Sequence, residues 1–160
     1  MKKIFLTTAI AALFTANVFA FNTSIKIEDE GAEHVSHAVI NRFKADFSGA
    51  KNVNWTVTAN SQKAEFTVDN VKMTAFYDTR GEFLGVTQYV DYKVIPAKAQ
   101  KEIAARYEGY DVASVIKFDT NSADPAIEPT VYFVDIKKDN KEMLLRVTPS
   151  ANVYFFQQVK

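Results

Sequence analysis

Alternation of apolar and polar positions is the clearest pattern in this chain, and it is concentrated between Asn52 and Val90. Side chains of a β-strand point alternately to the two faces of a sheet, so the pattern predicts strands with one buried face. Four such stretches follow one another, and a turn at 78–81 separates the last two, where Gly81 can adopt a positive φ. The stretch therefore predicts a four-stranded antiparallel meander. Trp55 falls on its buried side.

A helical pattern precedes this meander. From Gly31 to Gly49 an apolar residue recurs every four positions, which places these residues on one stripe of a helix. The recurring residues are Val35, Val39, Phe43 and Phe47. Gly49 is a suitable C-terminal stop. We expect this helix to cover the apolar face of the meander and to contact Trp55.

The same order of elements is predicted again later in the chain. Pro96 suits the first turn of a second helix that ends at Gly109. Four further strands are expected at Val112–Phe118, Thr130–Lys137, Glu142–Val147 and Asn152–Val159. We therefore predict an α+β fold of two tandem units, 31–92 and 93–160, each a helix followed by a four-stranded antiparallel meander, with the helices on one face. Whether the units share a sheet stays open, although about 60 to 70 residues is small for an independent core.

The first 30 residues are expected to lie outside this fold. Lys2 and Lys3 precede an apolar run over 4–14, and Val18 and Ala20 fit the positions before a cleavage site. The run is too short for a membrane-spanning helix, which needs about 20 apolar residues. Residues 1–20 are therefore interpreted as a signal peptide cleaved after Ala20, and 21–30 as a mobile leader. The prediction is a periplasmic or secreted protein without a membrane anchor.

One face of the predicted sheet carries more apolar residues than a solvated face should. If the turn at 78–81 forms a three-residue loop, the residues that gather away from the helices are Phe76, Leu84, Val86, Leu144, Tyr154 and Phe156. Exposed aromatic residues in one patch are typical of a surface that binds a partner. Two alternatives remain: the two units could pack these faces together, or the register could be shifted by one residue.

Several short motifs resemble the PepSY-like family. They are A-K-N-V-N-W at 50–55, A-E-F at 64–66 and F-Y-D-T-R-G-E-F-L at 76–84, together with the predicted second helix at 95–107. This family is similar to the β-lactamase-inhibitor proteins and is common among small exported proteins of Bacteroidetes-type bacteria. The resemblance implies helix-plus-antiparallel-sheet units and a non-catalytic binding or inhibitory role. It assigns no functional residues.

The composition offers little chemistry. The 19 basic and 19 acidic residues balance, so nucleic acid is not an expected partner, and the absence of cysteine excludes thiol chemistry. His34 and His37 lie near Glu30 and Glu33, but the spacing is generic and we expect solvated side chains instead of a metal site. The carboxylates of Glu65, Asp69 and Asp135 are also expected on solvated strand faces.

Two functions are therefore considered. The preferred one is a non-enzymatic, cofactor-free binding module that holds a protein or peptide on its sheet face. The alternative is a small-ligand or envelope-sensing protein with a pocket between the helices and the sheet.

Overall fold

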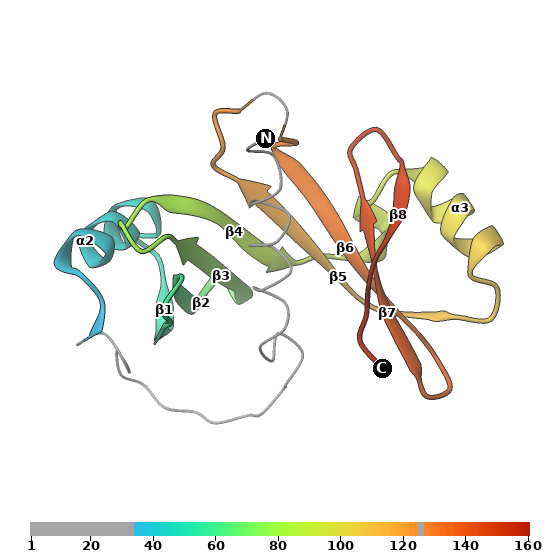
Figure 1. Ribbon diagram of the computed structural model, residues 1–160, viewed down its shortest axis with the longest axis horizontal. Helices are drawn as coiled ribbons and strands as arrows, with labels where there is room; N and C mark the ends of the chain where they lie inside the picture. The colour runs from blue at the N-terminus through green and yellow to red at the C-terminus, as the bar shows by residue number, and fades with distance from the viewer. Residues whose placement is uncertain (1–33, 125–126) are drawn as a thin grey trace.

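The computed structural model describes residues 34–124 and 127–160, and it forms one continuous antiparallel sheet of eight strands. Every strand pairs with its neighbours in the sequence, in the order β1 to β8 (Figure 1). The strands are β1 Lys51–Val57, β2 Gln62–Val68, β3 Val71–Tyr77, β4 Phe83–Tyr89, β5 Asp111–Thr120, β6 Thr130–Lys138, β7 Lys141–Val147 and β8 Val153–Gln158.

The predicted fold class is wrong in its main feature. The chain is not two tandem helix-plus-four-strand units but a mostly β structure, one eight-stranded sheet with two short α-helices. The pairing of β4 with β5, from Gly85↔Thr120 to Tyr89↔Ile116, joins the strands that would otherwise be two unpaired edges. Unpaired edge strands leave backbone N–H and C=O groups without partners, which favours the single sheet.

The two helices occupy positions close to those predicted. α2 (His37–Asp46) begins after Ser36, whose Oγ accepts a hydrogen bond from the backbone N–H of Val39 at 3.3 Å. This cap explains why the helix starts at His37; the predicted start at Gly31 lies outside the described residues. α3 (Ala97–Arg106) follows Pro96 and a 3₁₀ turn, η2 (Tyr92–Val94). None of the described helices is long and apolar enough to span a membrane.

Both helices pack on the same face of the sheet, which we call the helix face. α2 lies against β1–β4, and α3 lies at the other end near β8 (Figure 1). Val86 of β4 contacts the cluster under α2, and Val90, four residues further on, contacts the cluster under α3. Residues four apart in a strand share a face, so the two clusters lie side by side.

Aromatic rings fill the space between α2 and the sheet. Trp55 is 5% exposed and its ring lies 5.2 Å from that of Phe43, so its predicted burial is confirmed. Phe43 also meets Phe66 edge-on at 4.9 Å, and Phe47 lies 4.8 Å from Phe66. Such tilted and edge-on pairs are favourable arrangements for aromatic side chains.

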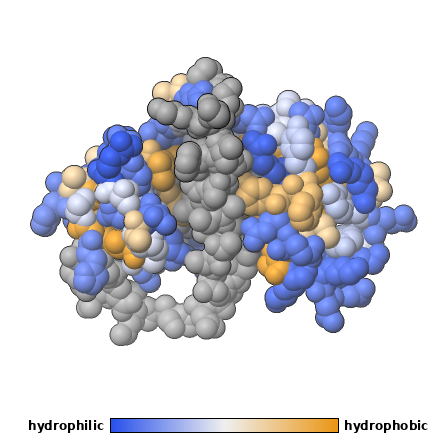
Figure 2. Space-filling model, viewed as in Figure 1, coloured by the Kyte–Doolittle hydropathy of each residue, from blue (hydrophilic) through white to orange (hydrophobic). Residues whose placement is uncertain are grey.

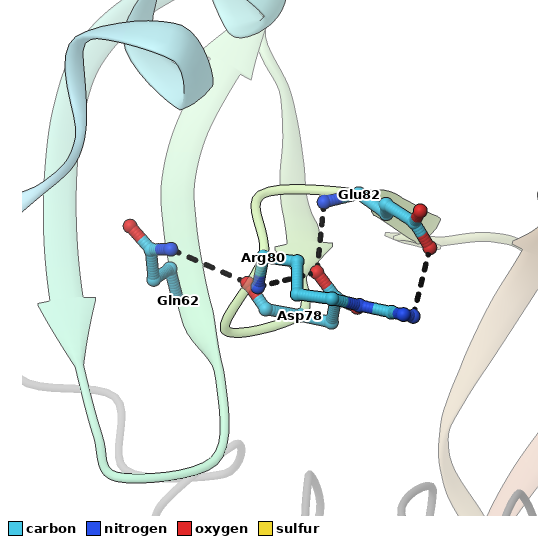
Figure 3. Close-up of polar contacts among 4 residues, drawn as sticks. All are labelled: Gln62, Asp78, Arg80 and Glu82. Carbon is cyan, nitrogen blue, oxygen red and sulfur yellow. Dashed lines mark hydrogen bonds and ion pairs between the residues drawn. The ribbon is translucent and has the colours of Figure 1, made fainter.

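The turn between β3 and β4 has the conformation predicted for it. Gly81 has φ +86°, and Tyr77 pairs with Phe83 across the hairpin. Asp78 Oδ1 accepts hydrogen bonds of 2.8 Å from the backbone N–H groups of Arg80 and Glu82 (Figure 3). Burial alone would raise the pKa of Asp78, but these bonds and the Arg80 guanidinium outweigh it and hold the pKa below its ordinary value.

A β-bulge in β4 changes the register that follows this turn. Phe76 pairs with Gly85 and Tyr77 with Phe83, so Leu84 is the extra residue and two consecutive positions share a face. Gly85 has φ +153°, and a Cβ built there would lie 2.5 Å from the carbonyl oxygen of Asp119. Only glycine allows β5 to approach so closely. The residues after the bulge are shifted relative to the prediction.

Candidate protein-interaction face

The face of the sheet opposite the helices, here called the helix-free face, carries a continuous apolar cluster at its centre. Its buried members are Phe76, Ile116, Phe118, Val131, Phe133 and Leu144, and its half-buried members are Leu84, Phe156 and Val159. They come from β3–β8 and the residue after β8, so the cluster crosses the β4–β5 junction. In Figure 2, hydrophobic atoms are visible in both halves of the molecule, among more hydrophilic ones.

Five of the six residues predicted to share this face do so. Phe76, Leu84, Leu144 and Phe156 belong to the apolar cluster. Tyr154 pairs with Arg146, two positions from Leu144 on β7, and so points to the same side. Val86 is the exception: it pairs with Ala75 and packs under α2, because the bulge at Leu84–Gly85 turns it to the helix face. The predicted register was wrong at Val86.

The five residues differ in how much of each side chain is accessible. Phe76 and Leu144 are buried, at 4% and 1% exposure, so they pack beneath the accessible residues of the face. Leu84 and Phe156 are half-buried, and the Phe156 ring packs 4.9 Å from that of Phe133. Tyr154 is 50% exposed. Tyr154 is therefore the most accessible of the five, followed by the half-buried Phe156 and Leu84.

The two ends of the loop between β5 and β6 contact the strands next to this cluster. Asn121 donates from its backbone N–H to the carbonyl of Leu84 at 3.0 Å and from Nδ2 to that of Phe83 at 3.1 Å. On the opposite side of the loop, Glu128 forms an ion pair of 2.6 Å with Arg146, the cross-strand partner of Tyr154. The loop thus borders the apolar cluster between β4 and β7.

A polar group interrupts the apolar face beside the cluster. Asp135 of β6 is 1% exposed, and Glu142 of β7 is 7% exposed. Lys137 Nζ lies between them, 3.5 Å from Asp135 Oδ2 and 3.3 Å from Glu142 Oε1. Burial raises the pKa of the Asp135 carboxyl, and the nearby Lys137 charge only partly opposes this.

The expectation that Asp135 lies on a solvated face is wrong. Asp135 alternates with Val131 and Phe133, which belong to the apolar cluster, and it pairs with the buried Leu144. Its position inside the apolar run 131–136 was the signal that could have identified it. The charge of an Asp in such a run needs a partner, which the sequence alone did not supply.

The structure offers no support for a metal site among residues 34–124 and 127–160. In that part of the chain no three His, Asp or Glu side chains are grouped so that they could hold a metal ion. His34 is described, and His37 is the first residue of α2, whereas Glu30 and Glu33 lie outside the described residues.

The comparisons with known proteins support the fold. A scan of protein families found no match for the sequence, and no curated protein matches it either. Solved structures from Bacteroides do match. A DUF2874 family protein from Bacteroides uniformis ATCC 8492 has a TM-score of 0.68 at 16% identity, over 78% of this chain and 90% of that chain.

Two further structures extend this likeness. A BLIP-like protein from Bacteroides fragilis NCTC 9343 has a TM-score of 0.64 at 15% identity, over 78% of this chain and 86% of that one. A protein from Bacteroides eggerthii DSM 20697, provisionally described as periplasmic, has a TM-score of 0.68 at 16% identity, over 78% and 89%. The chain therefore has a fold that it shares with BLIP-like and DUF2874 proteins.

Proposed function

We propose that this protein is an exported, non-catalytic module that recognises a protein or peptide partner through its helix-free face. The observation that carries the proposal is the apolar cluster on that face, bordered by the exposed Tyr154, while both described helices pack on the other side. Interfaces between proteins have an apolar centre enriched in aromatic residues and a polar rim. The contact surface would be Tyr154, Phe156 and Leu84, supported by Phe76 and Leu144.

The alternative, a small-ligand pocket between helices and sheet, has less support. Under α2 that space is occupied by the rings of Phe43, Phe47, Trp55 and Phe66, with centroids 4.8–5.4 Å apart. Under α3, Ala99 and Ile103 pack directly on the sheet. The BLIP-like neighbour agrees with a binding or inhibitory role, and the PepSY-like resemblance of the motifs at 50–55 and 76–84 agrees with the same role.

The test is to remove the exposed aromatic ring from the proposed surface. A partner is first captured from extract of the producing cell on the immobilised protein and identified by mass spectrometry. Tyr154→Ser should then weaken binding of that partner about tenfold or more, because aromatic residues at an interface often contribute about 2 kcal/mol. The thermal midpoint should stay nearly unchanged, since half of the side chain is already exposed.

Phe155→Ser is the matched control. Phe155 follows Tyr154 on β8, is 56% exposed and pairs with Leu145, which belongs to the cluster under α3, so it points to the helix face. We expect it to leave binding unchanged. Equal losses for the two variants, or no loss for Tyr154→Ser, would contradict the proposed surface.

Export is part of the proposal. The predicted signal peptide, 1–20, and leader, 21–30, lie outside the described residues, so export rests on the sequence pattern and on the description of the neighbour from B. eggerthii. N-terminal sequencing of the protein recovered from the producing cell should begin at Phe21. A mature protein that still begins at Met1 would contradict export by this route.

A further inference from the structure

We propose that the partner of the helix-free face inserts a lysine or arginine side chain between Asp135 and Ser114. This inference rests on the proposed function and specifies the chemistry of the partner: a peptide segment or protein loop with one basic residue among apolar ones.

Two polar atoms of cross-strand partner residues carry the inference. Asp135 Oδ1 and Ser114 Oγ are both closed to solvent, and within the described part of the chain neither has a hydrogen-bond partner. Asp135 on β6 and Ser114 on β5 are cross-strand partners. Ser114 alternates with Ile116 of the apolar cluster, and Asp135 alternates with Phe133 of the same cluster, so both side chains point to the helix-free face.

A buried carboxylate oxygen without a donor is costly, because it has lost its hydration and gained nothing in exchange. Asp135 Oδ2 has Lys137 at 3.5 Å, which is a long contact, and Lys137 is shared with Glu142. Oδ1 is left without a donor. A hydroxyl such as that of Ser114 accepts as well as donates, so an N–H group placed between the two strands could bond to both oxygens.

The charges favour a cation over a neutral donor. Asp135 and Glu142 carry two negative charges against the single shared charge of Lys137. Lys160 adds only a 4.0 Å contact to Glu142 from a side chain that is 75% exposed, where solvent screens the interaction. One additional positive charge would therefore neutralise the group.

The surroundings fit a long side chain with a charged end. Lys137 and Glu142 lie on one side of Asp135, and the other neighbouring positions of this face are apolar, namely Ile116, Phe133 and Leu144. Lysine and arginine place an aliphatic stem along apolar surface and keep the charged head at a polar group. Tyr89 borders the position: it pairs with Ile116, and the Asp135 charge contributes to the raised pKa of its hydroxyl after burial. Tyr89 is 39% exposed and the Lys137 side chain 45%, so both lie at the accessible edge.

The experiment selects peptides from a random phage-displayed library on the immobilised full-chain protein and then measures synthetic copies in solution. Peptides that lose affinity with Tyr154→Ser are kept, because they bind the helix-free face. These should contain one lysine or arginine flanked by apolar residues. Replacing that residue by norleucine should weaken binding to the wild-type protein about tenfold or more, as expected for a hydrogen bond between charged groups.

Asp135→Asn supplies the second arm of the cycle. It removes the charge while keeping the shape, so the lysine and norleucine peptides should bind this variant with nearly equal affinity. Asp119→Asn is the matched control, because Asp119 pairs with Lys117 at 2.7 Å and with Val86 across the strands, on the helix face. It makes the same change in net charge and should leave the preference for lysine intact.

The outcomes separate the two proposals. Peptides that need Tyr154 but bind equally well with norleucine, or keep their preference for lysine in Asp135→Asn, would overturn the basic-residue inference and leave the proposed function standing. If no selected peptide depends on Tyr154, the proposed peptide recognition fails and this inference fails with it. If Asp135→Asn does not fold, Ser114→Ala replaces it: it removes one of the two acceptors and keeps the carboxylate, so the preference for lysine should become smaller, and an unchanged preference would overturn the inference.

Discussion

Trp55→Ala is expected to lower the free energy of unfolding by about 3 to 5 kcal/mol, the usual loss for a large buried aromatic residue. Trp55 is 5% exposed and lies between α2 and the sheet, with the Phe43 ring at 5.2 Å and the Tyr77 ring at 6.1 Å. These neighbours belong to different elements, so a cavity left by the indole cannot close through movement of one side chain. Chemical denaturation followed by circular dichroism measures the loss.

Val57→Ala is the control for this measurement. Val57 lies on the same strand, two positions from Trp55, and points to the same face, but it is 42% exposed. It should therefore change stability by about 0.5 kcal/mol or less, as surface substitutions commonly do. A loss below about 1 kcal/mol for Trp55→Ala would show that the cluster under α2 does not depend on the indole.

Local pattern was sufficient to predict the elements and most of their faces. Strand alternation identified Trp55 as buried, and the Asp78–Gly81 sequence identified a turn whose Gly81 has a positive φ. Both are properties of a few adjacent residues. Such local preferences depend on the residue types and their spacing alone, so they can be read directly from a sequence.

Long-range pairing was not predictable in the same way. The pairing of β4 with β5 depends on residues that are about 30 positions apart in the sequence, as in Val86↔Asp119. No local alternation distinguishes a β4 that ends a sheet from one that continues it. The single sheet therefore followed from the structure, although the small size of each predicted unit already favoured it.

The candidate site was predicted in outline and missed in its polar part. Alternation placed Phe76, Leu144 and Tyr154 on one face, but the bulge at Leu84–Gly85 moved Val86 to the other. A bulge is one extra residue within a strand, and its position depends on contacts with the neighbouring strand. Asp135 was assigned to a solvated face on its residue type, whereas its burial comes from apolar neighbours on other strands.

Gly85→Ala is expected to destabilise the protein by about 2 to 6 kcal/mol, the combined range for an overpacked site and a strained backbone. The added Cβ would lie 2.5 Å from the carbonyl oxygen of Asp119 and 2.8 Å from the Phe118 ring, and φ is +153°. The carbonyl belongs to the backbone of β5, so it cannot move without disturbing the β4–β5 ladder.

Gly49→Ala is the control, because its Cβ would meet only Val68 at 3.7 Å. It should be neutral or slightly stabilising, by about 0.4 to 1 kcal/mol.

The same substitution should also reveal how the sheet holds together. Five residue pairs, from Gly85 to Tyr89, and a backbone hydrogen bond from Val90 to Val115 join β4 to β5, while α2 and α3 pack on separate clusters on either side of this junction. Trp55 is the single tryptophan of the chain, so its fluorescence reports on the cluster under α2, whereas circular dichroism reports on all strands. In the wild-type protein the two signals should change together during denaturation, as they do in a two-state transition. In Gly85→Ala they should separate, because the weakened ladder no longer couples the two clusters.

Coincident transitions in a destabilised Gly85→Ala would mean that the β4–β5 ladder is not the coupling element. The two ends of the sheet would then be coupled by the apolar cluster on the helix-free face, which spans the junction from Phe76 to Phe156.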